Sequence, residues 1–411
     1  MFIIGRIYRC KKDKEFKDMS SSEKTSNLTV KYSFIQGFFW MSFAAIMGFS
    51  SIYLLDAGFS NTQIGLLIAA AGIISAILQP IIASYADKPT SPSLKKIVVI
   101  LVCLILAFGL LLILCKSSLV LTGLFYGGCI TFLQLLNPLV NALGMESINQ
   151  GRRLNFGVSR GMGSVAYAIA AYVLGIAADK AGAGTVPITI ILSFALFLFA
   201  LIAFPFQKSI SPAEKAEAGG QSPLNFFRRY KKFTIVLVGC VLLYISHVLL
   251  NNFTFQIVES KGGNSADMGF SMALSALIEL PTMFFFGYML KKVRCDIWFR
   301  ITGIFFMLKC LGTLLAPNIP VFYGVQFFQM LGWALIAVSS VYYVNSIMDA
   351  QDAIKGQAYL TMTYTLGSVL ASLLGGALID KAGVNAMLIF GTAAAFIGMI
   401  ILLFATEKPS A

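Results

Sequence analysis

Three titratable side chains interrupt apolar segments that are long enough to cross a membrane. Glu279 precedes a Leu-Pro pair, Lys309 follows Phe-Met-Leu, and His247 is the only histidine of the chain. A charge at the centre of a bilayer costs at least about 2.5–3.5 kcal/mol, so such residues usually have a function. Because all three can exchange a proton, they predict a proton-coupling cluster. The alternatives are a permanent buried ion pair that fixes helix packing and, for His247, a hydrogen-bonded core residue.

A second polar set lies earlier in the chain and suits a polyhydroxylated ring. Glu146 ends one apolar segment, Arg160 begins the next, and Tyr167 follows Arg160 by about two turns on the same helix face. Arginine forms paired hydrogen bonds, and an aromatic ring can cover a sugar face. The alternative is an interfacial Glu–Arg pair beside a packed tyrosine. The amide side chains that we assign to the same solute site are Gln134, Asn137, Asn252 and Gln329.

Twelve long apolar segments position these residues. The chain has 411 residues, of which 58% are hydrophobic and only 12% charged, about half the charged share of a soluble protein. A membrane-crossing helix needs about 20 apolar residues. The sequence therefore predicts an all-α membrane protein with twelve transmembrane helices. The predicted spans are 32–55, 62–86, 96–115, 118–145, 158–178, 185–206, 232–257, 267–290, 297–316, 320–347, 354–379 and 383–405.

The polar stretch 207–231 divides these spans into two groups of six that resemble each other. Gly-Ser-Val at 163–165 recurs at 367–369, and the helices that contain it both end in Asp-Lys-Ala-Gly. Residues 58–65 likewise resemble residues 263–269. Parallel six-helix repeats of this kind describe the major facilitator fold. The predicted regions are a basic cytoplasmic tail (1–31), an N-terminal six-helix bundle (32–206), a cytoplasmic linker (207–231), a C-terminal six-helix bundle (232–405) and a short cytoplasmic tail (406–411).

Basic residues are distributed unequally between the two predicted sides of the membrane. Most of the 31 Lys and Arg residues fall in the N-terminal tail, the linker and the loops on the same side. Because cytoplasmic loops are rich in Lys and Arg, we predict a multi-pass protein of the cell membrane with both termini in the cytoplasm. The net charge of +13 thus reflects topology, and the predicted partner is the lipid bilayer rather than nucleic acid. The seven cysteines lack metal-ligand spacing, so no metal or cofactor is predicted.

Three stretches within 31–405 resemble the oligosaccharide–proton symporters of the major facilitator superfamily, the lactose-permease-like group. Residues 38–48 are similar to the first helix of that group, and residues 58–87 to its second helix and the following loop. The most specific stretch is Glu146 together with 152–163, which is similar to the segment that supplies the sugar-binding Glu and Arg. The resemblance implies solute binding by Glu146 and Arg160, and Tyr167 falls where lactose permease has a sugar-stacking Trp. Asp87 resembles a gating carboxylate, with a plain helix-end turn as the alternative.

Several positions of the proton pathway depart from that group. Lys309 stands where lactose permease has an Arg that is tied to proton coupling. Gln329 and Gly332 stand where it has a coupling His and Glu, and two aspartates and a lysine of its seventh and eleventh helices are also replaced. Glu279 is then the only acid at mid-membrane depth, so we assign it as the proton carrier.

These observations predict proton-coupled import of a small sugar or similar polar organic solute by alternating access, with the protein acting as a monomer. An efflux pump, or an importer of aromatic acids or nucleosides, is the alternative on the same fold, and Na⁺ is the alternative coupling ion. A membrane-embedded enzyme is disfavoured because the chain has one histidine, no paired intramembrane acids and no phosphate-binding loop. A sensor or scaffold is disfavoured because the N-terminal tail is too short for a signalling domain.

Overall fold

The computed structural model describes residues 28–86, 90–115, 118–207 and 223–408, and the regular elements within them are all helical. Ten of the described helices are long and apolar enough to span a membrane, and a bent pair, Leu28–Gly48 with Ser50–Asp56, adds an eleventh. The last helix, α15 (Ala350–Ala405), contains two helices that meet at Gly383, where φ is 83°. With these two counted separately, the number equals the twelve predicted, and the predicted all-α membrane fold is confirmed.

The first span of the N-terminal half bends by 44° before α2. The bend follows a single π-helical turn, η1 (Ala44–Gly48), and an extra residue in a helical turn is a common cause of such a bend. The further elements of this half are α2 (Ser50–Asp56), α3 (Asn61–Ala86), α4 (Leu94–Leu114), α5 (Leu119–Asn149), α6 (Phe156–Ala181) and α7 (Thr185–Ala203).

The C-terminal half opens with a short helix that lies inside the predicted linker, so the linker is not entirely irregular. Its elements are α8 (Pro223–Arg229), α9 (Lys231–Asn252), α10 (Thr254–Ser260), α11 (Ser265–Lys292), α12 (Cys295–Leu315), α13 (Ile319–Val325), η2 (Gln326–Gln329), α14 (Trp333–Ile347) and α15. Most of the predicted N-terminal tail and the predicted gating residue Asp87 lie outside the described residues.

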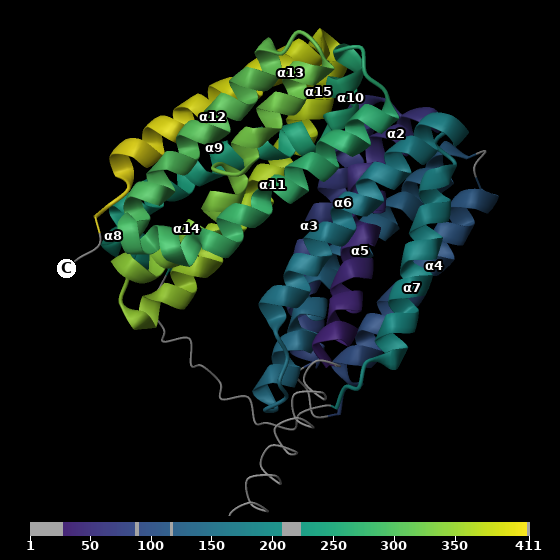
Figure 1. Cartoon of the computed structure of the whole chain (residues 1–411), viewed down its shortest axis with the longest axis horizontal. Helices are drawn as coiled ribbons and strands as arrows, with labels where there is room; N and C mark the ends of the chain where they lie inside the picture. Colours follow the sequence, from purple (N-terminus) through teal and green to yellow (C-terminus); the bar gives the residue numbers. More distant parts are fainter. Residues whose placement is uncertain (1–27, 87–89, 116–117, 208–222, 409–411) are drawn as a thin grey trace, which may run out of the picture.

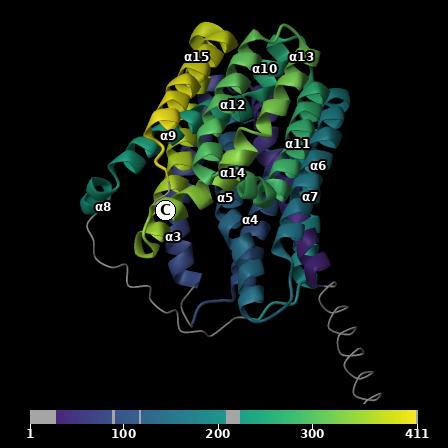
Figure 2. The ribbon, with the colours of Figure 1, turned by 60° about the vertical axis from the view of Figure 1, so that its left-hand side comes forward.

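The two halves lie side by side as separate helical bundles (Figure 1). Here the end of the molecule at which α2, α10 and α13 lie is named the α10 end, and the opposite end, where α8 lies, the α8 end (Figures 1 and 2). Large apolar side chains cover the outside as well as the core; Phe404 is 84% exposed and Phe199 is 72% exposed. An apolar exterior of this extent suits hydrocarbon as the surrounding solvent.

The halves touch mainly along two helix pairs, α3 with α15 and α6 with α11. At the α10 end, a Cβ atom on Gly65 would clash with the carbonyl oxygen of Ser372, and one on Gly269 would clash with that of Ala171. Small residues let membrane helices approach to backbone contact. The two contacts are equivalent under the internal repeat, so the molecule is closed at the α10 end by two matching crossings.

Candidate binding site in a central cavity

A cavity of about 630 Å³ lies between the two halves, within the range that holds small molecules. Its walls come from the first span, α3, α5 and α6 on one side and from α9, α10, α11, α12, α13, η2, α14 and α15 on the other. The predicted site residues that line it are Gln134, Asn137, Arg160, Tyr167, His247, Asn252, Glu279, Lys309 and Gln329. Glu146, near the end of α5, is not among the described residues that line the cavity, and its role in solute binding stays a prediction.

Arg160 is held on the N-terminal wall by an aromatic ring. Asn155 caps α6 by accepting a hydrogen bond from the backbone N–H of Val158, which places Arg160 in the first turns of the helix. The guanidinium carbon of Arg160 lies 4.0 Å from the ring centroid of Trp40. The Nη1 atom of Arg160 also donates to Ser164 Oγ at 3.3 Å. A cation over an indole face is attracted by the ring electrons, so the guanidinium is oriented before any solute binds.

A chain of hydrogen bonds fixes the ring that carries Arg160. The Nε1 atom of Trp40 donates to Gln36 Oε1 at 3.2 Å. The Nε2 atom of Gln36 donates to Tyr32 Oη at 2.8 Å and to Asn141 Oδ1 at 3.2 Å. Asn141 lines the cavity, so this chain connects the arginine support to the amides of α5.

Pro138 frees a backbone carbonyl of α5 to accept a hydrogen bond from a side chain. Proline has no N–H, so the carbonyl four residues earlier, that of Gln134, loses its helical partner. Gln79 Nε2 donates to this carbonyl at 3.3 Å, and Ser75 Oγ donates to the side-chain Oε1 of Gln134 at 2.7 Å. The proline therefore leaves a polar, hydrogen-bonded patch on a wall of the cavity at membrane depth.

A broken helix forms part of the C-terminal wall. The span that begins with α13 passes through η2 and resumes as α14, and between them Gly332 has non-helical φ and ψ angles of −89° and −94°. The freed carbonyl of Met330 accepts a hydrogen bond from Thr282 Oγ1 at 2.9 Å. Irregular backbone is tolerated at this depth only where protein or a cavity satisfies it. The break turns Gln329 and Trp333 toward the cavity.

Gln329 bridges the two charged residues of the C-terminal wall. Its Nε2 atom donates to Glu279 Oε1 at 2.7 Å, and its Oε1 atom accepts from Lys309 Nζ. Among the described residues, no ion pair within 4.0 Å joins Glu279 to Lys309 directly. The positive charges of Lys309, on the same wall, and of Arg160, on the opposite wall, both attract the Glu279 carboxylate. The structure thus brings Glu279 and Lys309 together as the sequence predicts, but through a residue that the sequence assigned to the solute.

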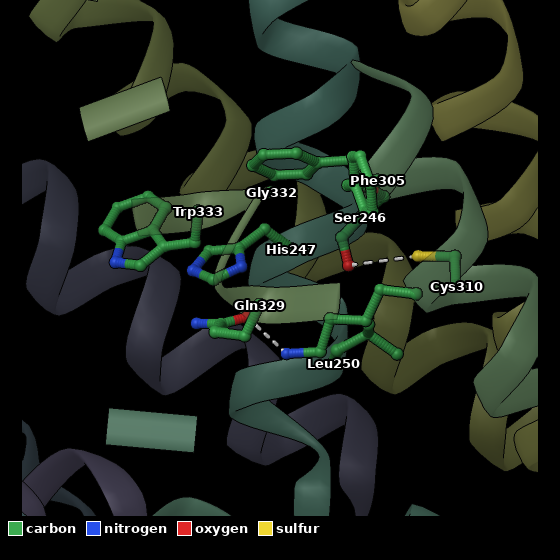
Figure 3. A pocket seen from close by; sticks show the side chains of 10 residues that line it. Ser246, His247, Leu250, Phe305, Cys310, Gln329, Gly332 and Trp333 are labelled. Atoms are coloured by element: carbon green, nitrogen blue, oxygen red, sulfur yellow. Dashed lines mark hydrogen bonds between the residues drawn. The ribbon is translucent and has the colours of Figure 1, made fainter. Parts of the chain in front are cut away.

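His247 lies beside this bridge and has different partners. Its ring stacks on Trp333 with centroids 4.2 Å apart and an interplanar angle of 8°. Figure 3 shows the two side chains next to each other in the pocket. Its Nε2 atom lies 2.8 Å from Asn251 Nδ2. In the described part of the chain it makes no hydrogen bond to Glu279 or Lys309, although the charge of Lys309 acts on it. The role of His247 in proton coupling stays a prediction.

Two further predicted residues have clear places in the structure. Tyr167 lines the cavity from α6 and packs against the small cluster of Ala168, Ala273 and Ala276. Asn252 lies at the end of α9, where its Nδ2 atom donates to Ser372 Oγ at 2.9 Å. Tyr167 thus faces the solute space, whereas the amide of Asn252 also ties α9 to α15.

Sequence reasoning missed the aromatic supports of the site. Trp40 and Trp333 are two of only three tryptophans in the chain. Each stands four residues after a glutamine: Trp40 follows Gln36, and Trp333 follows Gln329. For Trp40 that spacing places the indole beside the amide on one helix face and could have identified it. For Trp333 it could not, because the helix breaks at Gly332, between Gln329 and Trp333. Tyr364 completes the aromatic group, with its ring centroid 5.6 Å from that of Trp333.

Comparison with known proteins agrees with this architecture. The model of the MFS_1 like family matches residues 29–390. The chain is 22% identical over 379 residues to the maltose permease of Geobacillus stearothermophilus, covering 90% of this chain and 92% of that protein. A crystal structure of the nucleoside transporter NupG is similar with a TM-score of 0.73 at 15% identity, covering 92% of this chain and 98% of that chain. A bacterial homologue of the iron transporter ferroportin gives a TM-score of 0.69 at 12% identity, covering 93% and 99%.

The family match spans most of the chain, and the structural matches establish the same two-bundle fold. The proteins that share this family and fold are transporters rather than enzymes. The chain therefore belongs to the MFS_1 like family and is a membrane transporter of the major facilitator superfamily.

Proposed function

We propose that this transporter imports a small sugar, or a similar polar ring solute, together with a proton. The observation that carries the proposal is one cavity with a supported arginine and amides on one wall and an acid on the other. Arg160 and Asn137 can bind hydroxyl oxygens, while Glu279 faces the same space. The similarity to a maltose permease supports a sugar as the solute.

Coupling follows from the charges across the cavity. Ionised Glu279 attracts both Arg160 and Lys309. When a proton neutralises the carboxylate, Arg160 is no longer held by that attraction and can bind the solute through charge-assisted hydrogen bonds. Solute and proton then favour the same state of the cavity, and favouring one state over the other is what a ligand must do to drive a conformational change. One charge crossing 100 mV releases about 2.3 kcal/mol, enough for more than a tenfold solute gradient.

The proposed orientation places the α8 end in the cytoplasm. Lys95, Lys96, Arg152 and Arg153 lie in or next to the loops at that end. Basic loops stay on the cytoplasmic side during insertion. With this orientation both termini are cytoplasmic, the α10 end faces outward, and the two crossings at the α10 end close the outer entrance of the cavity.

A nucleoside is the second candidate solute, and the stacked pair of His247 and Trp333 favours it. Together with Tyr364 they give the C-terminal wall flat aromatic surfaces on which a base could stack. A thermal-shift screen of the purified protein against mono- and disaccharides, nucleosides and aromatic acids separates these solutes. If only nucleosides stabilise the protein, the proposed solute is a nucleoside and not a sugar.

The central test is Glu279→Gln in proteoliposomes, with the solute from that screen. The amide keeps the hydrogen bond to Gln329 but cannot change its charge, so proton-driven accumulation is lost while solute counterflow continues. Glu259→Gln, at an exposed position of α10, is the matched control and retains both activities. Normal accumulation by Glu279→Gln would reject Glu279 as the proton carrier.

A further inference from the structure

The two crossings at the α10 end begin with the same capping arrangement. At the start of α3, the Ser60 N–H donates to Gln63 Oε1 and the Gln63 N–H donates to Ser60 Oγ. At the start of α11, the equivalent Asn264 and Asp267 exchange the same pair of hydrogen bonds, each 3.0 Å long. Each helix therefore satisfies its own third N–H group, and the first two remain available to a partner.

On α3, a carboxylate from the other half takes these two N–H groups. Asp380 Oδ1 accepts from the backbone N–H of Asn61 at 3.2 Å and from its Nδ2 at 2.9 Å. Asp380 Oδ2 accepts from the backbone N–H of Thr62 at 2.7 Å and from its Oγ1 at 2.6 Å. An anion at a helix N-terminus also interacts favourably with the helix dipole. Both carboxylate oxygens are thus used to hold the first turn of α3.

The contact extends to a second element of the C-terminal half. Gln256, on α10, donates from Nε2 to the side-chain oxygen of Asn61 at 2.7 Å. Close by, Ser51 Oγ on α2 donates to the backbone carbonyl of Asn252 at 2.9 Å. The first turn of α3 is therefore hydrogen-bonded to α10 as well as to α15, and α2 adds a bond across the same boundary.

The equivalent position in the other crossing does not make this contact. Asp179 ends α6 as Asp380 ends the first helix of α15, yet Asp179 is exposed and accepts no hydrogen bond within the described chain. Where α3 has the hydroxyl of Thr62, α11 has Ala266. The acid at the start of α11, Asp267, instead accepts from Tyr323 Oη at 2.7 Å inside its own half.

We propose that Asp380 is a latch that holds the α3–α15 crossing closed, and that the α6–α11 crossing has no latch of this kind. Opening the cavity at the α10 end then requires the first turn of α3 to leave the carboxylate. The α6–α11 crossing needs only to separate van der Waals contacts, which are those between small residues and the edge contact of the Tyr172 and Phe270 rings. The inference concerns the gate of the proposed transport cycle and depends on neither the solute nor the coupling ion.

The test compares Asp380→Asn with the matched control Asp179→Asn in lipid nanodiscs without solute. Hydrogen exchange read by mass spectrometry reports the amides at 61–64 and at 265–268. We expect exchange at the start of α3 to rise about tenfold in Asp380→Asn, and exchange at the start of α11 to change less than twofold in Asp179→Asn. Equal changes in the two variants would overturn the proposed asymmetry.

A second measurement separates gate opening from simple loss of a cap. Ile257, buried on α10, lines the cavity near the α10 end. In an Ile257→Cys background, alkylation of the new cysteine, identified by its peptide mass, should be several-fold faster with Asp380→Asn and unchanged with Asp179→Asn. Faster amide exchange without faster alkylation would show that Asp380 only caps α3, and would reject the latch.

Thr62→Ala keeps the test decisive if Asp380→Asn does not fold. Alanine already stands at the equivalent position of α11, so the local fold tolerates it. The variant removes one of the four hydrogen bonds to Asp380, and both readouts should rise in the same direction but by a smaller factor. No change in either readout would contradict the latch. Because no solute or proton gradient is used, these outcomes leave the Glu279 proposal untouched.

Discussion

The two walls of the central cavity come from the two repeated halves of the chain but carry different functional groups. The N-terminal wall holds a cation, Arg160, on the face of Trp40, and among its described lining residues there is no acid. The C-terminal wall holds an acid and a base, Glu279 and Lys309, joined by Gln329 at a helix break. A wall with fixed charge suits recognition, whereas a wall that contains an acid–base pair suits a change of charge. In the proposed mechanism, the duplicated fold therefore separates solute recognition from proton coupling.

The largest expected effect is that of a substitution at Arg160, on the N-terminal wall, to which we assign solute recognition. In Arg160→Lys the ammonium cannot reproduce the planar fork of the guanidinium or its stacking on Trp40. We expect solute affinity to fall about 10- to 100-fold, the range expected for charge-assisted hydrogen bonds. Isothermal titration measures this loss, and accumulation at saturating solute should persist. Arg153→Lys, in the exposed loop before α6, is the control, and an equal loss there would point to a general defect.

Removing the Gln329 bridge of the C-terminal wall should affect proton coupling and not solute affinity. Gln329→Leu removes both hydrogen bonds between Glu279 and Lys309, so that two buried charges lose their shared partner. We expect proton-driven accumulation to fall about tenfold while solute affinity changes little. Gln326→Leu is the matched control, because Gln326 also lines the cavity but bonds to Ser275 and not to the charged residues. If Gln326→Leu lost accumulation and Gln329→Leu did not, Gln326 rather than Gln329 would be the residue that supports coupling.

Much of the fold and part of the site could be predicted because the bilayer penalises charge and polarity strongly. Glu279 and Lys309 stand out against apolar neighbours, and the repeat and spans follow from hydropathy. Glu146 stands out less, because a charge at a helix end gives no information on whether it faces a cavity, the surface or another loop.

The roles of neutral residues could not be predicted in the same way. Gln329 owes its bridging position to the place where its helix breaks, which depends on packing against Thr282 and neighbouring helices. Trp333 looks like any other apolar side chain in a hydrophobic segment, because the helix break at Gly332 separates it from Gln329. A histidine stack such as that of His247 also depends on the rotation of two helices about their axes, for which periodicity gives no unique value.

A double-mutant cycle measures how strongly the acid and the base of the C-terminal wall depend on each other. Lys309→Met leaves Glu279 with one fewer compensating charge and should lower the melting temperature by several degrees. Adding Glu279→Gln should recover part of that loss, with an interaction energy of about 1 kcal/mol. Thermal unfolding in one detergent gives all four values. Additive effects would mean that Gln329 does not connect the two residues energetically.

The smallest expected effect is that of His247→Phe. Phenylalanine keeps the stack on Trp333 but loses the contact with Asn251. We expect solute affinity to change by about fivefold or less, the size of one neutral hydrogen bond, with accumulation intact. Uptake driven by an imposed pH gradient checks this. Complete loss of accumulation would move His247 into the proton pathway.

The break between η2 and α14 also limits how this span can move in a bilayer. The Met330 carbonyl lies outside the helical ladder and is satisfied by Thr282 from the protein side. If the span rolled about its own axis, that carbonyl would turn toward hydrocarbon, where an unpaired polar group costs several kcal/mol. The span can therefore tilt with its bundle but cannot rotate about its own axis. During such a tilt the side chain of Gln329 keeps its orientation toward the cavity.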